Sequence, residues 1–191
     1  MKKAVVLLAD GFEEIEALTV VDVLKRADVC CDMCSIKEDK EVHGAHNIKV
    51  KSDVSLNDID SKDYDAIVIP GGMPGSTNLR DDQKVIDLVK SFNDDYKIVA
   101  AICAGPIVLG KAKILKGKKA TSYPGFEKEL EGSMYKEDLV VQDGNIITSR
   151  GPAVAIYFAL KILENLVPDK EKVLEVKKGM LLDLVEDNMN K

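Results

Sequence analysis

The sequence contains no tryptophan, and aromatic residues make up only 5% of its 191 residues. A surface that stacks single-stranded bases needs several aromatic rings, so this composition argues against such a role. Basic residues are outnumbered as well, with 27 Lys and Arg against 33 Asp and Glu and a formal charge of −6. Nucleic acids and anionic membrane surfaces both favour basic faces. We therefore expect neither as a partner.

Long hydrophobic runs are also missing. No stretch approaches the ~20 apolar residues that a membrane-spanning helix requires. The run at 4–9 resembles the start of a signal peptide, but it ends at Asp10 and acidic residues follow at once. A secretory signal has a longer apolar region that ends in small residues. We interpret the run as a buried first strand and expect a cytoplasmic protein.

Residues that bind metals are few, with two histidines and four cysteines. His43 and His46 lie in a polar turn with no acidic or cysteine partner at ligand spacing, so we expect no metal site. Cys31 and Cys34 match the C-x-x-C spacing of redox and zinc sites. They fall in a predicted strand, where residues three apart point to opposite faces. We interpret them as buried structural thiols.

Short β-rich runs alternate with helical runs along the chain. Continuous apolar runs such as 66–69 and 98–102 are typical of strands covered on both faces of a parallel sheet. Asp143-Gly144 between two short strands predicts one antiparallel hairpin. The alternation predicts one α/β domain over residues 1–191, an open and mostly parallel sheet with helices on both faces. We predict strands at 3–9, 29–36, 48–50, 66–69, 98–102, 118–121, 139–142 and 146–148, helices at 13–27, 81–92, 104–112, 152–166 and 170–178, and solvated turns at 37–41 and 58–63.

In open α/β sheets, functional sites form at the carboxyl ends of the strands. Cys103 follows the strand 98–102 and precedes a predicted helix, with Ala101, Ala104 and Gly105 as small neighbours. This pattern favours a nucleophile elbow, a sharp strand-to-helix turn that presents a reactive side chain. We expect the helix dipole to favour the thiolate and lower the thiol pKa. The alternative is a small buried cysteine that only packs.

Two other strand ends carry candidate groups. Gly71 and Gly72 follow the strand 66–69, where backbone N–H groups without side chains could form an oxyanion hole or a plain turn. Glutamates 13, 14 and 16 follow the first strand; we interpret Glu13 and Glu14 as offsetting the helix dipole. Glu16 heads an apolar helical row, so its carboxyl could be buried, protonated and able to transfer protons. Glu13 heads a similar row, and periodicity does not choose between them.

A fourth strand end places Arg150 before a predicted helix. Its guanidinium could bind an anionic substrate group or steady a thiolate, or it could be structural. Asp22 and Arg26 are spaced as an ordinary helical ion pair, or as an oligomer contact.

Taken together, these segments resemble the ThiJ/PfpI superfamily, and within it the branch of the Parkinson-associated protein deglycase, which is glyoxalase III-like. The resemblance covers nearly the whole chain, in family order and at family spacing. The matching segments are LADGFEEIEALTVVDVLKRA, AIVIPGGMPGSTNL, VAAICAGPIVL, ATSYPGFEKEL and DGNIITSRGP.

The resemblance implies a flavodoxin-like α/β sandwich that forms a homodimer, with no metal or organic cofactor. Cys103 would be the reactive, oxidisable cysteine and Glu16 the protonated carboxyl hydrogen-bonded to it. Gly71, Gly72 and Ala104 would line the oxyanion pocket, and Arg150 would contribute an anion-binding group.

The sequence departs from the family pattern at several positions. Tyr123 stands where many members have a histidine near the thiol, and a phenol is a weak base at neutral pH, so Glu16 would carry most proton transfer. His46 falls where a family arginine is often found, which weakens anion binding there. The peptidase branch has a histidine directly after the nucleophile; this chain has Ala104, so peptidase activity is not expected.

Two functions remain open from the sequence. The first is a cysteine-dependent glyoxalase or deglycase that acts on methylglyoxal or on glycated protein and yields lactate. The second is a redox-sensing, chaperone-like protein in which Cys103 is oxidised to a sulfinate with little turnover. Both use the same residues, and the sequence does not separate them.

Overall fold

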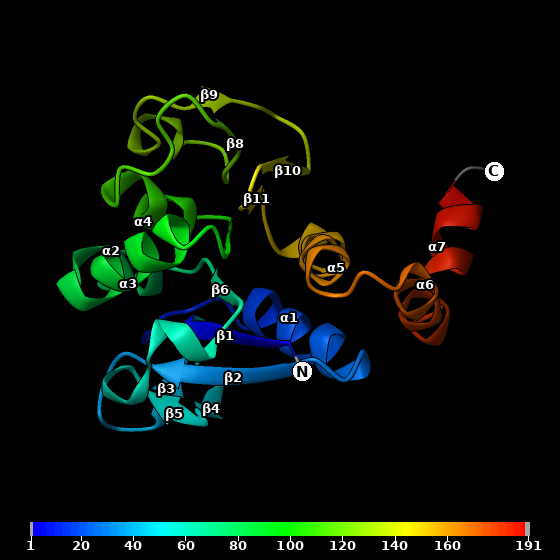
Figure 1. The fold of residues 1–191 in the computed structure, drawn as a ribbon, viewed down its shortest axis with the longest axis horizontal. Coiled ribbons are helices and arrows are strands. Elements are labelled where there is room, and N and C mark those ends of the chain that lie inside the picture. Colours follow the sequence, from blue (N-terminus) through cyan, green and yellow to red (C-terminus); the bar gives the residue numbers. More distant parts are fainter. Residues whose placement is uncertain (1, 190–191) are drawn as a thin grey trace.

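The computed structural model describes residues 2–189 and is built on one seven-stranded sheet (Figure 1). The strand order is β10-β11-β7-β6-β1-β2-β5, and every pair is parallel except β10 with β11. That pair is the hairpin predicted at Asp143-Gly144. The strands are β1 (Lys3–Leu8), β2 (Cys30–Ser35), β5 (Val54–Ser55), β6 (Ala66–Ile69), β7 (Ile98–Ile102), β10 (Val140–Asp143) and β11 (Ile146–Ser149).

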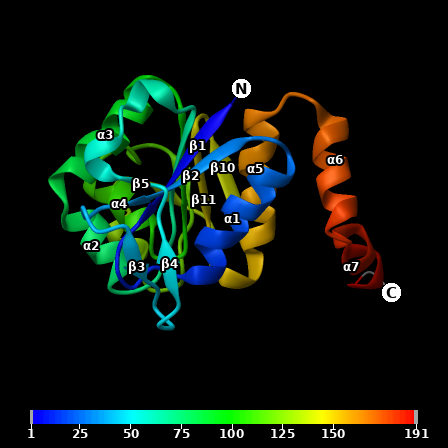
Figure 2. The ribbon, with the colours of Figure 1, turned by 90° about the horizontal axis from the view of Figure 1, so that it is seen from below.

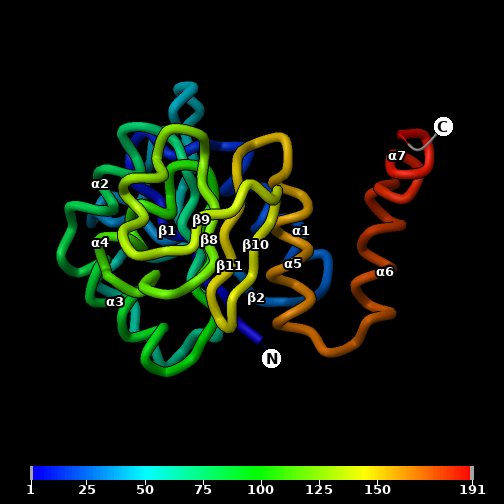
Figure 3. Tube along the Cα trace, turned by 90° about the horizontal axis from the view of Figure 1, so that it is seen from above, coloured from blue at the N-terminus to red at the C-terminus, as the bar shows by residue number. Residues whose placement is uncertain are grey.

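Helices cover both faces of this sheet, as the alternation of elements predicts. Figure 2 shows α2, α3 and α4 on one side of the strands and α1 and α5 on the other. The helices α6 and α7 lie outside α5 and α1 (Figure 3). The helices are α1 (Glu14–Arg26), α2 (Gly75–Asp81), α3 (Gln83–Asp94), α4 (Pro106–Lys111), α5 (Ala155–Leu166), α6 (Lys170–Gly179) and α7 (Leu182–Met189).

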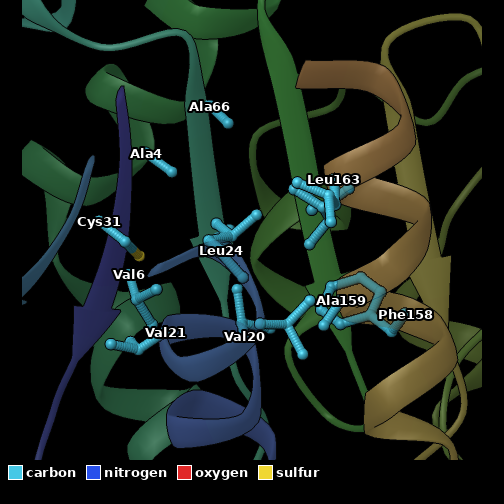
Figure 4. Packing of buried hydrophobic residues seen from close by; sticks show 14 of the residues in the cluster. Ala4, Val6, Val20, Val21, Leu24, Cys31, Ala66, Phe158, Ala159 and Leu163 are labelled. Carbon is cyan, nitrogen blue, oxygen red and sulfur yellow. The ribbon is translucent and has the colours of Figure 1, made fainter. Parts of the chain in front are cut away.

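Each face of the sheet has its own hydrophobic core. On one side, Val6 of β1 belongs to a core that includes α1 and α5, in which Phe158 of α5 is fully buried (Figure 4). On the other side, Val5 and Leu7 of the same strand belong to a core that includes α2, α3 and α4. The continuous apolar run of β1 is therefore explained by burial on both faces. Burying these side chains is the main favourable term that holds the helices in place.

The predicted cysteine arrangement is also found. Cys31 is buried in the core under α1, and Cys34 in the core on the opposite face. All four cysteines are free, and burial raises the pKa of Cys31 and of Cys34 to about 12. Their thiols are therefore protonated and inert at neutral pH.

Several elements lie where the sequence analysis did not predict them. The segment at 37–41 leads into an unpredicted strand, β3 (Glu41–His43), which pairs antiparallel with β4 (Lys49–Lys51), the strand predicted at 48–50. The stretch at 58–63 contains short 3-10 turns rather than only loop. The helix α2 begins directly after the glycine loop, and α7 follows a left-handed residue, Leu181. Short polar elements of this kind have too few residues to show a periodic pattern.

None of the helices within residues 2–189 combines the length and apolar character needed to cross a membrane.

Candidate active site

Cys103 occupies a sharp turn between β7 and α4. Its φ of +63° lies in the left-handed region, where the backbone of any residue other than glycine is strained. Two hydrogen bonds maintain this conformation: the Cys103 N–H donates to the Ser149 carbonyl at 2.9 Å, and the Cys103 carbonyl accepts from the Tyr123 N–H at 2.8 Å. The predicted nucleophile elbow is thus present in the backbone.

Glycines around the elbow leave room for its side chain. A Cβ on Gly105 would lie 2.6 Å from the Ile69 carbonyl oxygen, so only glycine fits there. A Cβ on Gly71 would lie 2.6 Å from both the Cys103 Cβ and the Glu16 Oε2 atom. Because Gly71 has no side chain, the thiol and the carboxyl group face each other across it.

Glu16 is completely buried in α1. Its Oε2 accepts a hydrogen bond from the Gly71 N–H at 2.7 Å, whereas its Oε1 has no hydrogen-bond partner among the described residues. Burial raises the pKa of Glu16 to about 7, and the Gly71 N–H and Cys103 oppose this shift. Periodicity left Glu13 and Glu16 open, and the family resemblance assigns the role to Glu16. In the structure, Glu16 faces Cys103 across Gly71, whereas a Glu13 oxygen lies 3.7 Å from His46 Nδ1.

Burial raises the pKa of the Cys103 thiol to about 12, and the neighbouring Glu16 carboxylate raises it further. The backbone N–H groups of Ala104 and Gly72 lower it, but by less. The expectation of a thiol with a lowered pKa is therefore wrong, because burial and a carboxylate outweigh the dipole of the short helix α4. When Glu16 holds a proton, the repulsion disappears and its hydroxyl can donate toward the sulfur. The two groups thus titrate as a coupled pair.

The glycine loop contributes to this site in two ways. Gly72 has a φ of +88°, and a Cβ there would collide with the backbone of residues 11 and 13. Because the N–H groups of Gly72 and Ala104 stabilise the thiolate, they act at the sulfur. The Gly71 N–H, in contrast, already donates to Glu16. Of the three predicted oxyanion residues, Gly72 and Ala104 therefore have N–H groups directed at the Cys103 sulfur, and Gly71 positions the Glu16 carboxyl.

The other predicted site residues lie at the margin of this cluster. The Tyr123 side chain is about half exposed and passes close to Gly151. Arg150 donates from Nη1 to the Glu137 carbonyl at 2.9 Å, which ties the end of β11 to the loop that precedes β10. Among the described residues, no hydrogen bond or ion pair joins either side chain to Cys103.

Sequence reasoning missed the role of Glu14. Its side chain is buried: Oε1 accepts from the His46 N–H at 2.8 Å, and Oε2 lies 2.8 Å from His46 Nδ1. Glu14 therefore holds the β3–β4 hairpin against α1 and does more than offset the helix dipole. The expectation that His46 lacks an acidic partner is also wrong. The two residues are 32 positions apart, so no local spacing could have indicated the contact.

We predict that Glu16→Gln reduces the pH dependence of stability. The folded pKa of Glu16 is raised from 4.5 to about 7, so the folded state binds more protons than the unfolded state between these values. The stabilisation from the buried neutral carboxyl is complete below pH 4.5 and is lost as pH rises through 7. Urea unfolding across this range should show a shallower decline in unfolding free energy for the variant.

Glu38→Gln is the matched control because Glu38 is exposed. An unchanged slope in Glu16→Gln, or an equal change in both variants, would contradict the assignment of a raised pKa to Glu16.

Comparisons with known proteins show the family and the fold of the chain. The chain is 42% identical to the Drosophila melanogaster "Protein dj-1beta" over 183 residues, which are 95% of this chain and 97% of that protein. It is 36% identical to the Danio rerio "Parkinson disease protein 7 homolog", over 95% of this chain and 97% of the relative. The crystal structure of Drosophila melanogaster DJ-1beta superposes with a TM-score of 0.90, covering 94% of this chain and 97% of that one. The sequence model of the DJ-1/PfpI family matches residues 2–165, and the chain belongs to this family.

Proposed function

We propose that this protein is a cysteine-dependent glyoxalase or deglycase that converts methylglyoxal, or its adducts on proteins, to lactate. The observation that carries the proposal is the pairing of Cys103 at a strained elbow with a buried carboxyl, Glu16, whose Oε1 is unpartnered. A nucleophile and a proton-transfer group with a pKa of about 7 are together suited to catalysis at neutral pH.

The proposed reaction begins when the Cys103 thiol passes its proton to the Glu16 carboxylate and its sulfur attacks the aldehyde carbon of methylglyoxal. A C–S bond forms, and the carbonyl oxygen becomes an alkoxide that the N–H groups of Gly72 and Ala104 stabilise. Glu16 donates its proton to give a hemithioacetal. Its carboxylate then moves a proton from the former aldehyde carbon to the neighbouring position through an enediol, which yields a lactoyl thioester. Water cleaves the thioester to lactate and restores the thiol. The scheme uses no metal or organic cofactor.

The residues at the margin have supporting roles in this proposal. Tyr123, half exposed beside Gly151, lines the entrance for the substrate, and Arg150 attracts the anionic lactate product. Neither residue transfers the proton, because Glu16 is the buried carboxyl beside the thiol. Ala104 occupies the position of the histidine in the peptidase branch, which disfavours proteolysis. The four free cysteines support a cytoplasmic location, where thiols stay reduced.

We predict that Cys103→Ser and Glu16→Gln each abolish lactate formation from methylglyoxal without glutathione. The first removes the nucleophile and the second the proton carrier, each of which typically contributes at least ~100-fold. Lactate is quantified with stereospecific dehydrogenases. Cys30→Ser is the control, because Cys30 is also partly exposed but lies outside the site, and it should retain full activity. Full activity in Cys103→Ser, or none in the wild type, would contradict the proposed mechanism.

A second candidate function is redox sensing, and the unpartnered Glu16 Oε1 supports it too. Two molecules of peroxide would oxidise the Cys103 thiol to a sulfinic acid and release two molecules of water. A protonated Glu16 would then donate a hydrogen bond to a sulfinate oxygen. A solved structure of Toxoplasma gondii DJ-1, 36% identical to this chain with a TM-score of 0.89, is described as oxidized.

We predict that mild peroxide adds two oxygen atoms to the wild type, as seen in the intact-protein mass. Cys103→Ala should lack this addition, and Cys30→Ser should retain it, since Cys31 and Cys34 are buried. An addition that persists in Cys103→Ala would contradict the sensing role. Lactate formation and oxidation are measured on the same samples, so the two functions are distinguished.

We also propose that the protein forms a homodimer, as the family resemblance implies. Three exposed apolar side chains lie around the N-terminal end of α1, on the helix, on the hairpin and on the glycine loop. They are Ile15, Ile48 and Met73, each about half exposed. Exposed apolar groups that gather at one place are typical of association surfaces.

We predict that Ile15→Asp shifts the sedimentation of the protein from dimer to monomer, because a charge would be buried in the interface. Leu174→Asp on α6 is the control, since Leu174 is equally exposed but lies away from this surface. A monomeric wild type, or a dimer unaffected by Ile15→Asp, would contradict the assigned interface.

A further inference from the structure

A cluster of three metal-binding side chains lies beside the proposed active site. Glu13 and Glu14 stand at the N-terminal end of α1, and His46 lies in the turn between β3 and β4. One ligand atom from each residue lies within 4.8 Å of the others. The hairpin brings the imidazole here because Phe12 and Gly44 form a β-bridge, so the contact is fixed by the backbone.

The distances in this cluster suit one small cation. His46 Nδ1 is 2.8 Å from an oxygen of Glu14 and 3.7 Å from an oxygen of Glu13. A tetrahedral zinc ion with bonds of about 2.1 Å holds its ligand atoms roughly 3.4 Å apart. The observed distances lie on either side of this value. Binding would replace the proton that His46 Nδ1 and Glu14 Oε2 share and would move these two atoms apart toward the spacing of zinc ligands.

The Glu14 and Glu13 carboxylates differ in their partners. The Glu14 carboxylate is oriented by the His46 N–H, which binds Oε1 and leaves Oε2 beside the imidazole. The Glu13 carboxylate accepts no hydrogen bond from any residue in 2–189, although only 12% of its side chain is exposed. Two largely buried carboxylates therefore share a single imidazole. A second positive charge is missing from this cluster, and a divalent cation would supply it.

We propose that Glu13, Glu14 and His46 bind a zinc ion. Imidazole and carboxylate ligands together favour zinc over magnesium or calcium, which prefer oxygen ligands alone. Three protein ligands leave a fourth position for water. In a single protomer the cluster opens to solvent at His46, whose side chain is 66% exposed. This proposal departs from the sequence-based expectation of no metal site, and it does not depend on the proposed enzymatic activity.

A second histidine in the same hairpin offers an internal comparison. His43 Nε2 lies 3.2 Å from an oxygen of Glu41, but that carboxylate also pairs with Lys49 at 2.9 Å. The lysine already supplies the positive charge and would repel a metal ion. His43 and His46 thus lie in the same hairpin, and we expect zinc to bind at His46 but not at His43.

The test is a zinc titration of the full-length protein by calorimetry and thermal unfolding, in a Cys103→Ser background that removes the reactive thiol. We expect one zinc ion per chain and a rise in melting temperature. His46→Ala and Glu13→Gln should each weaken binding by roughly tenfold or more, as loss of a ligand does, and His43→Ala should have no effect. Cobalt serves as a spectroscopic probe and should show no thiolate-to-metal absorption in either the wild type or the Cys103→Ser protein.

The proposal is overturned if zinc produces neither heat nor a thermal shift. It is also overturned if His46→Ala binds zinc as tightly as the protein without this substitution, or if His43→Ala weakens binding as much as His46→Ala does. The His46–Glu14 pair would then be purely structural. A thiolate absorption band in the wild type would assign the metal to Cys103 instead. Because the site lies near the proposed dimer surface, the oligomeric state is measured before and after zinc addition. Lactate formation by the wild type is assayed separately without zinc, so failure of either proposal leaves the other intact.

Discussion

The left-handed backbone at Cys103 is the constraint on which the rest of the site depends. A strained residue persists only where its surroundings hold it, and here Ser149 of β11 accepts a hydrogen bond from the Cys103 N–H and the Tyr123 N–H donates one to the Cys103 carbonyl. The turn also requires Gly105, because any Cβ there would meet the backbone after β6. The parallel order of β11, β7, β6 and β1 brings these strand ends together. The thiol is thereby fixed where the glycine loop and α1 converge.

The protonation state of Glu16 controls the electrostatics around this thiol. A fully buried carboxyl is costly when ionised, and one hydrogen bond from Gly71 compensates only in part. Burial is the main cause of both raised pKa values; the Glu16 carboxylate raises the pKa of Cys103 further, whereas the hydrogen bond from the Cys103 thiol opposes the rise at Glu16. A proton shared between carboxyl and thiol serves both thioester chemistry and stabilisation of an oxidised sulfur. The two candidate functions therefore use the same pair of residues, Cys103 and Glu16. They differ in the molecule that reacts with the thiol, which is methylglyoxal in one and peroxide in the other.

The hairpin of β3 and β4 packs against the N-terminal end of α1 on its solvent side. Glu14 connects it to α1 through His46, while Glu16, two residues later, faces the thiol. One turn of helix thus presents carboxylates in two directions, because successive residues are rotated by about 100°. The acidic start of α1 consequently belongs to two separate clusters, one buried at the elbow and one at the hairpin.

The sequence by itself determined the parallel α/β fold, the antiparallel hairpin at Asp143, the elbow at Cys103 and the burial of Cys31 and Cys34. These follow from local signals, namely apolar runs, turn residues and the alternation of side chains along a strand. Only the tertiary structure shows that Glu16 is fully buried, that the pKa of the Cys103 thiol is raised and that His46 contacts Glu14. The physical reason is that burial and electrostatic coupling depend on which distant segments meet in space, and spacing along a chain does not encode that.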